Sequence, residues 1–183
     1  MAVDNDIPEH DSTSVHVAVR VRPQSAKEKL AMSQICTTVA PNAPQIILGK
    51  DSCFTFDCVF NINSNQEQIF QTLAKPLIDG CMSGYNATIL AYGQVGARIS
   101  LFIFQTGSGK TYTMGTGFDL GSPNLDAGII PRAVQYLFSK ISQCRSQAAA
   151  KHEPVPEFKV VAQFLELYNE ELVDLLDSDK VGF

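Results

Sequence analysis

Residues 86–115 read NATILAYGQVGARISLFIFQTGSGKTYTMG, and this stretch decides the fold. TGSGKT at 106–111 has the ending of a phosphate-binding loop, in which backbone N–H groups cradle phosphates and a lysine reaches the outer ones. The complete pattern requires a glycine five residues before Gly109, but Phe104 stands at that position. A glycine-glutamine pair, Gly93-Gln94, occurs eleven residues too early. The motif is therefore present but interrupted.

Removing one contiguous block restores the motif. Without VGARISLFIFQ at 95–105, the sequence becomes AYGQTGSGKTYTMG, which satisfies the pattern G-x-x-x-x-G-K-T in full. We therefore interpret the block as an insertion into a phosphate loop. The alternative for TGSGKT alone is a flexible Gly/Ser turn that happens to precede Lys-Thr.

The flanking patterns alternate between strand and helix, which predicts an α/β class with a mixed sheet. We expect a half-buried strand at 14–23, where valines alternate until Pro23, and a central strand buried on both faces at 86–93. Further strands are expected at 45–49, 53–60 and 158–169.

Helices are expected after Gly109, over 129–142, and from a capping box of Ser64 and Glu67 to about Gly80. A short helical turn is expected at 170–177. Residues 115–128 and 147–157 have the composition of loops.

Composition excludes several classes of protein. The 183 residues suffice for one domain, and the net charge of −5 offers no global attraction to nucleic acid. The start of the chain is acidic and polar, unlike a signal peptide, and no apolar run approaches the ~18 residues of a membrane span. Five scattered cysteines without a C-x-x-C pair argue against a disulfide framework or a zinc site and fit a reducing cytosol: Cys36, Cys53, Cys58, Cys81 and Cys144.

The repaired loop and its surroundings resemble the motor domain of kinesins. The resemblance covers roughly 14–180 without the insert, and two segments, 45–60 and 113–133, resemble the chromokinesin or fourth kinesin family. The matching segments in chain order are VAVRVRP (17–23), FTFDCVF (54–60), NQEQIF (65–70), GYNATILAYGQ (84–94), GIIPRAVQYLF (128–138) and FLELYNEELVDLL (164–176).

The resemblance implies a P-loop NTPase-type mixed sheet flanked by helices, kinesin motor-like but incomplete. It implies that 14–183 is the N-terminal half of a motor domain with an insertion at 95–105. The residues at 1–13 are expected, from their own sequence, to form a disordered leader. The resemblance also implies ATP and Mg²⁺ as ligands, a microtubule partner, and a cytoplasmic, cytoskeletal, homodimeric parent with a coiled coil.

The resemblance also assigns site residues. Phosphate and magnesium contacts would come from Gly93, Gln94, Thr106, Gly107, Ser108, Gly109, Lys110 and Thr111, with the Thr111 hydroxyl on Mg²⁺. The adenine would be bordered by Arg20, Arg22 and Pro23, and Tyr112 would stack on it. The alternatives are a solvated strand face for the two arginines and helix packing for Tyr112. No catalytic residue is assigned, because the switch segments of kinesins would lie after Phe183.

The insert allows two arrangements, both expected to weaken ATP binding. In the first, which we favour, 86–93 keeps the central strand and 95–105 bulges from the loop. In the second, RISLFIF at 98–104 takes the strand, and Phe104 stands where the backbone must turn tightly. The Val-Gly start and Phe-Ile-Phe-Gln end of the block suggest a translated intron, and the alternative is a genuine surface loop.

Three functions remain at this point. The first is part of an ATP-dependent microtubule motor that is not competent alone. The second is a non-catalytic truncated, splice or gene-model product with weak or no nucleotide binding. The third is a different P-loop enzyme, such as a small-molecule kinase.

Overall fold

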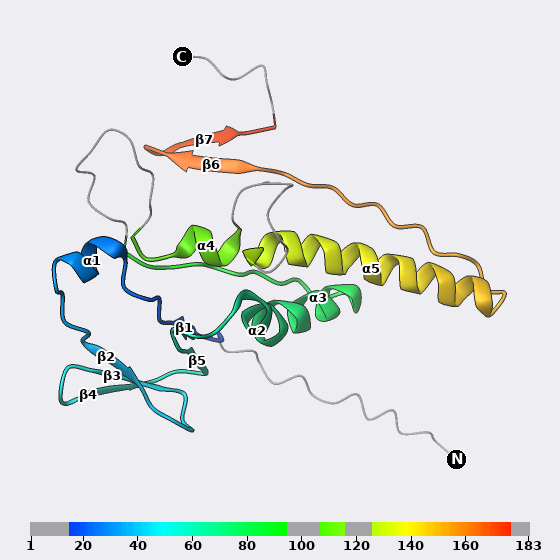
Figure 1. The fold of residues 1–183 in the computed structure, drawn as a ribbon. Helices are drawn as coiled ribbons and strands as arrows, with labels where there is room; N and C mark the ends of the chain where they lie inside the picture. Colours follow the sequence, from blue (N-terminus) through cyan, green and yellow to red (C-terminus); the bar gives the residue numbers. More distant parts are fainter. Residues whose placement is uncertain (1–14, 95–106, 116–125, 177–183) are drawn as a thin grey trace. The chain divides into compact units, whose positions relative to one another are not determined.

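The computed structural model describes residues 15–94, 107–115 and 126–176 (Figure 1). The chain divides into two compact units, 1–136 and 137–183, which are described separately. The predicted leader at 1–13, the insert at 95–105 and most of the predicted loop at 115–128 lie outside the described residues.

The first unit combines parallel and antiparallel strand pairs. β1 (Ala18–Arg20) pairs in parallel with β5 (Cys58–Phe60), so that Val19 lies opposite Val59. β2 (Thr37–Val39), β3 (Gln45–Leu48) and β4 (Ser52–Thr55) form an antiparallel sheet in that order. The strand predicted at 45–49 is confirmed as β3, whereas the one predicted at 53–60 is divided into β4 and β5, which belong to different sheets. The strand predicted over 14–23 is much shorter, and Val15 and Val17 are exposed.

One helical segment follows β5. It consists of α2 (Gln66–Ile69), the π-helical turn η1 (Phe70–Ala74) and α3 (Lys75–Met82). The predicted capping box was one residue early, because Asn65 accepts from the Gln68 N–H at 2.8 Å and Gln68 Oε1 accepts from the Asn65 N–H at 3.1 Å. Asparagine caps a helix as well as serine does, so the predicted pair Ser64 and Glu67 and the observed pair Asn65 and Gln68 both fit the capping-box pattern.

A short helix that we did not predict precedes β2. α1 (Ala26–Leu30) begins with a complete capping box, in which Ser25 and Glu28 satisfy each other's backbone N–H groups. Met32 then ends it in the left-handed region, with φ of 48°.

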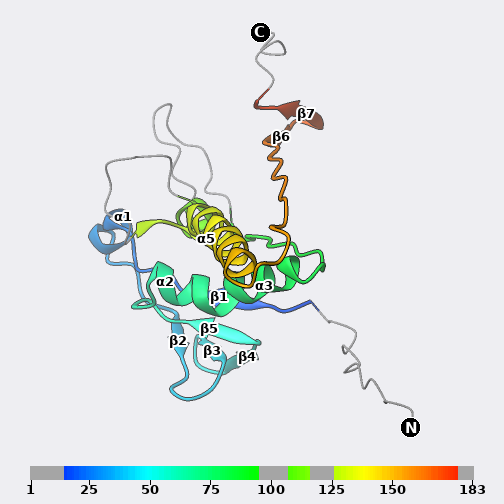
Figure 2. The same cartoon turned by 90° about the vertical axis from the view of Figure 1, so that its right-hand side faces the viewer.

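The core of this unit lies where the helical segment meets α5 (Ile129–Ala150). The side chains of Ile69, Phe70, Ala74 and Ile129 are buried together, with Phe60 of β5 packed against them. Tyr136 contacts Phe70 edge to face, with ring centroids 5.9 Å apart, and donates to Asp79 Oδ1 at 2.9 Å. Figures 1 and 2 show α2 and α3 beside the β1–β5 pair.

The central strand predicted at 86–93 is wrong for the described structure. The segment forms no strand, and the side chains of Leu90 and Tyr92 are exposed, although Ile89 packs on the core. A doubly buried strand needs a hydrogen-bonded neighbour on each edge and a layer on each face. Among the described residues, no strand pairs with this segment.

Two predicted helices are present. α4 (Lys110–Met114) follows Gly109, and α5 extends beyond the predicted residues, so 147–150 are helical and not a loop. α5 ends where His152 turns left-handed at φ 58°, with the Glu153 N–H bonded to Ala148 O at 3.0 Å. This Schellman pattern satisfies carbonyls at the helix end.

The second unit contains a β-hairpin instead of the helical turn predicted at 170–177. β6 (Leu165–Tyr168) pairs antiparallel with β7 (Glu171–Asp174), so the strand expected over 158–169 is confirmed only in its last part. Asn169 and Glu170 both have positive φ, which is the type I′ turn that joins two antiparallel strands.

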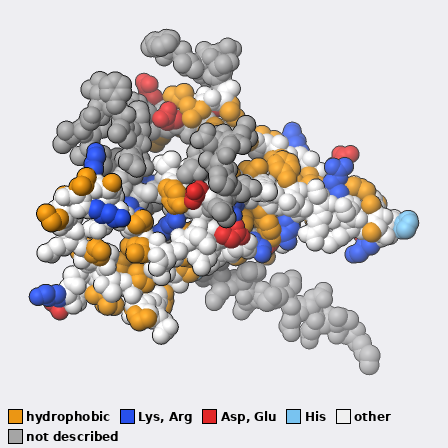
Figure 3. Space-filling model, in the orientation of Figure 1, with side chains coloured by type: hydrophobic (Ala, Val, Ile, Leu, Met, Phe, Trp, Pro, Cys, Tyr) orange, Lys and Arg blue, Asp and Glu red, His pale blue; other side chains and the backbone are white. Residues whose placement is uncertain are grey.

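Many apolar side chains of the described residues are exposed. Figure 3 shows hydrophobic side chains at several places on one face of the molecule. Leu90, Leu167 and Leu172 are among the most exposed. No helix in the described residues is long and apolar enough to cross a bilayer.

Candidate nucleotide site

The structure places the first arm of the interrupted loop, Gly93 and Gln94, beside its second arm, residues 107–111. Lys110 Nζ donates to the carbonyl oxygens of Gly93 at 2.9 Å and Gln94 at 3.2 Å, and to Ser108 Oγ at 3.1 Å. A Cβ on Gly93 would lie 2.9 Å from Ser108 Oγ, which is too close for any larger residue without a shift. The proximity of Gly93 to Ser108 and Lys110 agrees with the favoured arrangement, but the central strand at 86–93 that this arrangement also required is absent from the described residues. Residues 95–106, which include the insert and Thr106, lie outside the described residues.

The second arm has the backbone of a phosphate loop. Gly109 is the N-cap of α4 and is left-handed, with φ of 83°, a conformation that glycine adopts at little cost. Lys110 begins the helix and Thr111 follows in its first turn, with an exposed side chain. Gly107 is exposed and Ser108 is half-buried at the mouth of the loop.

Arg20 and Tyr112 lie against each other. The Arg20 guanidinium is 5.1 Å from the centroid of the Tyr112 ring, an arrangement that attracts a cation to an aromatic face. Arg20 Nη1 also donates to Gln66 Oε1 at 2.9 Å and to Thr113 Oγ1 at 2.8 Å. Burial lowers the pKa of Arg20, and the neighbouring Tyr112 opposes this effect.

Arg22 and Pro23 are exposed, and Arg22 pairs with α1. Its two terminal nitrogens donate to the two carboxylate oxygens of Glu28 at 2.7 and 2.6 Å, and Nη1 also donates to Pro23 O at 3.0 Å. Hydrogen bonding from Arg22 lowers the pKa of Glu28 to about 2. The same bond raises the pKa of Arg22.

Gln66 is the important residue that the sequence interpretation missed. Its side chain is 2% exposed, and its amide nitrogen donates to Tyr112 O at 2.6 Å and Asp126 O at 3.3 Å. A signal was available, because Gln66 precedes Ile69 and Phe70 by three and four residues and so shares their helical face. A polar residue on a buried face must have partners.

Gly115, at the end of α4, and Gly128, just before α5, lie close together. A Cβ on Gly128 would lie 2.6 Å from the backbone nitrogen of Gly115, so the two backbones are in direct contact. Arg132 donates to Ala127 O at 2.8 Å and forms an ion pair with Glu67 of α2. The Tyr112 hydroxyl donates to Asp126 Oδ1 at 3.3 Å.

A family comparison agrees with this loop and its surroundings. The model of the kinesin motor domain matches residues 20–182. This chain belongs to the kinesin motor-domain family.

Curated kinesin relatives match most of this chain. It is 53% identical to kinesin-like protein KIF21B and 54% identical to KIF21A, both of Homo sapiens, over 166 and 170 residues. It is 41% identical to chromosome-associated kinesin KIF4 of Mus musculus. The three alignments cover 91%, 93% and 91% of this chain, but only 10%, 10% and 12% of those relatives. The chain thus spans about a tenth of the length of these relatives.

Solved kinesin structures confirm the mixed α/β motor fold. The crystal structure of Drosophila Kin10/NOD in complex with divalent manganese and ADP matches with a TM-score of 0.66 at 28% identity, over 93% of this chain and 50% of that one. NOD docked with bovine tubulin into a map of the microtubule complex gives a TM-score of 0.67 at 27% identity, over 92% and 50%. The predicted kinesin motor-like α/β class is therefore confirmed, over about half the length of these solved chains.

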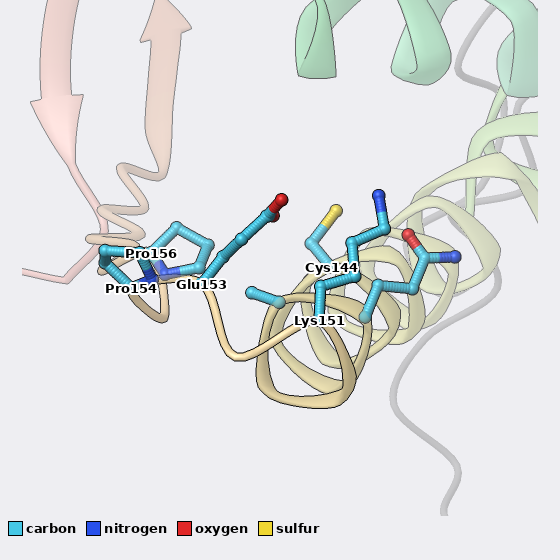
Figure 4. Close-up of a pocket in the computed structure, with 7 residues that line it drawn as sticks. Cys144, Lys151, Glu153, Pro154 and Pro156 are labelled. Carbon is cyan, nitrogen blue, oxygen red and sulfur yellow. The ribbon is translucent and has the colours of Figure 1, made fainter.

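A separate cavity of about 290 Å³ lies in the second unit of this kinesin-family chain (Figure 4). Its lining comes from the last turns of α5 and the segment after it, and includes Cys144, Lys151 and Glu153. No predicted nucleotide residue lines it, so it is distinct from the loop site.

Proposed function

We propose that residues 93–94 and 106–112 form an ATP site, in a chain that is part of a microtubule motor of the fourth kinesin family. The observation that carries the proposal is the position of Lys110, whose ammonium contacts carbonyls of the first arm and the serine of the second. Family membership supports nucleotide binding, and NOD, a solved relative, holds ADP. A cytoskeletal location and a homodimeric parent belong to the same proposal.

The residues present fit a triphosphate and a divalent cation. Gly93 and Gly109 keep the loop free of side chains where the backbone must approach phosphate oxygens. Lys110 would exchange its neutral acceptors for phosphate oxygens, which form stronger charge-assisted bonds. Thr111 carries a hydroxyl oxygen, a ligand type that Mg²⁺ accepts in proteins, and the manganese bound to NOD is also divalent.

The part of the proposed site that would hold the adenine, called the base end, is formed by Arg20, Arg22, Pro23 and Tyr112. Arg20 lies on one face of the Tyr112 ring, so an adenine would stack on the opposite face. Tyr112 as a residue is 44% exposed, which supports access of a base to its side chain. Arg22 and Pro23 would border the base from the end of β1.

ATP titration tests the proposal. We expect the chain to bind ATP with Mg²⁺ and Lys110→Ala to weaken binding at least about tenfold, because charged hydrogen bonds are lost. Lys29→Ala, in α1, is the matched control and should bind as the wild type does. Thr111→Ala should remove most of the dependence on Mg²⁺. A wild-type chain that binds no ATP would favour the alternative, a truncated or gene-model product without a working site.

We further propose that this polypeptide alone is not a competent motor. Hydrolysis requires a positioned water and stabilisation of the charge that develops, and we assign no residue here to either task. Microtubule pelleting and ATPase assays on the 183-residue chain should show no microtubule-activated turnover. Activated turnover would refute this second proposal and leave ATP binding untouched.

A further inference from the structure

Gln66 connects the two members of the Arg20–Tyr112 pair through a single buried amide. Its oxygen accepts from Arg20 Nη1 at 2.9 Å, and its nitrogen donates to the backbone oxygen of Tyr112 at 2.6 Å. The side chain comes from the first turn of α2, whereas its partners come from β1 and α4. One carboxamide therefore sets the position of the guanidinium relative to the ring.

Further hydrogen bonds hold the Gln66 amide and the Arg20 guanidinium in place. The nitrogen of Gln66 also lies 3.3 Å from Asp126 O, and Arg20 Nη1 has a second acceptor in Thr113 Oγ1 at 2.8 Å. Arg20 Nη2 donates to Ser64 O at 3.4 Å. The guanidinium is therefore held by Thr113 of α4, by Ser64 in the segment that leads into α2, and by Gln66, which itself bonds Tyr112 O of α4.

The chemistry of this position requires an amide of this length. Glutamine supplies an acceptor for Arg20 and a donor for Tyr112 O, whereas glutamate would place a second oxygen against the two carbonyls. Methionine fills a similar volume but supplies neither bond. Because Gln66 is 2% exposed, water cannot replace a lost partner.

We propose that Gln66 is a positioning residue for the base end of the nucleotide site. It holds Arg20 against one face of the Tyr112 ring, so that the opposite face is oriented for the base. This inference rests on the proposed ATP site. It predicts that Gln66 governs the part of the affinity that comes from the base and not the part that comes from the phosphates.

The experiment compares ATP with inorganic tripolyphosphate, which has the phosphates but no base. In the wild-type chain we expect ATP to bind more tightly than tripolyphosphate. In Gln66→Met this ratio should fall about three- to tenfold, the effect of one net hydrogen bond, with unchanged affinity for tripolyphosphate. Gln71→Met is the matched control, since Gln71 is an exposed glutamine of η1 whose amide nitrogen donates to Glu67 Oε1 at 2.6 Å, away from Arg20 and Tyr112. It should keep the wild-type ratio.

A second measurement needs no nucleotide and no substitution at Gln66. NMR spectra of the wild-type chain should show Arg20 side-chain signals shifted by the ring current of Tyr112, assigned by their loss in Arg20→Lys. Absence of shifted signals in the wild type would overturn the inference, as would an unchanged ratio in Gln66→Met. Equal loss of both ligands in Gln66→Met would indicate a purely structural role and overturn it too. A wild-type chain that binds neither ligand would instead overturn the nucleotide site itself.

Discussion

Two glycines of this kinesin-family chain occupy positions where a larger residue would collide, and the two positions differ in kind. At Gly93 the nearest atoms belong to the side chain of Ser108, which can rotate. At Gly128 they belong to the backbone at Met114 and Gly115, which cannot move without disturbing the end of α4. The second glycine is therefore the more demanding one for stability.

Gly128→Ala should destabilise the chain by about 1–3 kcal/mol, the usual cost of inserting a methyl group into a filled space. Gly80→Ala is a control with the opposite sign, because a Cβ there meets nothing within 4 Å and Gly80 lies inside α3. It should stabilise by about 0.5–1 kcal/mol through helix propensity. Urea denaturation measures both changes, and equal effects of the two substitutions would contradict the packing argument.

The Arg22–Glu28 pair predicts a titration. Since the pKa of Glu28 is lowered to about 2 in the folded chain, the pair stabilises the fold above the ordinary glutamate pKa of 4.5. This contribution disappears as the pH falls through about 2. NMR titration of the Glu28 carboxyl should give this low midpoint in the wild type. In Arg22→Gln the midpoint should rise toward 4.5. A midpoint that does not move would mean that the pair does not persist in solution.

At the scale of the element, the β6–β7 hairpin has an unusual turn. Asn169 and Glu170 both adopt positive φ, but only asparagine tolerates that region readily, and glutamate has no local reason to adopt it. The register of the two strands, with Leu167 opposite Leu172, fixes the turn at these two residues. The turn therefore carries strain that its sequence does not relieve.

Glu170→Gly should stabilise the hairpin by about 0.5–1 kcal/mol, because it creates the Asn-Gly pair that type I′ turns prefer. Hydrogen exchange of the amides in β6 and β7 should slow accordingly. Asn42→Gly, at another positive φ of 72°, is the control and should have a smaller effect because asparagine already suits that conformation. Faster exchange in Glu170→Gly would refute the assignment of the turn.

The same hairpin shows where sequence reasoning fails. Residues 170–177 are mostly helix-favouring types, yet pairing of β7 with β6 overrides this local preference. The sequence also lacks an Asn-Gly pair that would signal the turn. The failure at 86–93 has a different cause: apolar letters predict burial, but strand formation depends on neighbours that local sequence does not specify. Where the signal is local, as at Gly109 before α4 or in the periodicity of α5, the prediction is confirmed.

The candidate site, like the fold, was predictable from the sequence where the signal is local and not where it depends on distant residues. The loop motif predicted Lys110 and the neighbouring glycines, because the lysine and the loop backbone are the groups that contact the phosphates. Gln66 was not found, because its role depends on Arg20 and Tyr112, which are 46 residues away on either side in sequence. Long-range polar contacts of this kind require the fold.

At the scale of the whole molecule, the block 95–105 is the feature that separates this chain from an uninterrupted phosphate loop. Removing Val95–Gln105 should strengthen ATP binding, since the longer excursion adds closure entropy of about 1–2 kcal/mol, or roughly five- to thirtyfold in affinity. Titration of ATP into both chains measures the difference. Replacing the block with eleven Gly and Ser residues separates length from sequence and should leave the affinity low. Equal ATP affinities with and without the block would refute the prediction that the insertion weakens ATP binding.

The contacts of Lys110 have a thermodynamic consequence for the whole site. The ammonium is already solvated by two carbonyls and a hydroxyl, so the apo loop competes with any incoming anion for the same charge. Observed affinity is then the intrinsic affinity reduced by the fraction of molecules in which the lysine has been released. For the proposed ATP site, we therefore expect weakly charged anions to compete poorly with these three acceptors of Lys110, and a ligand with concentrated negative charge to displace them.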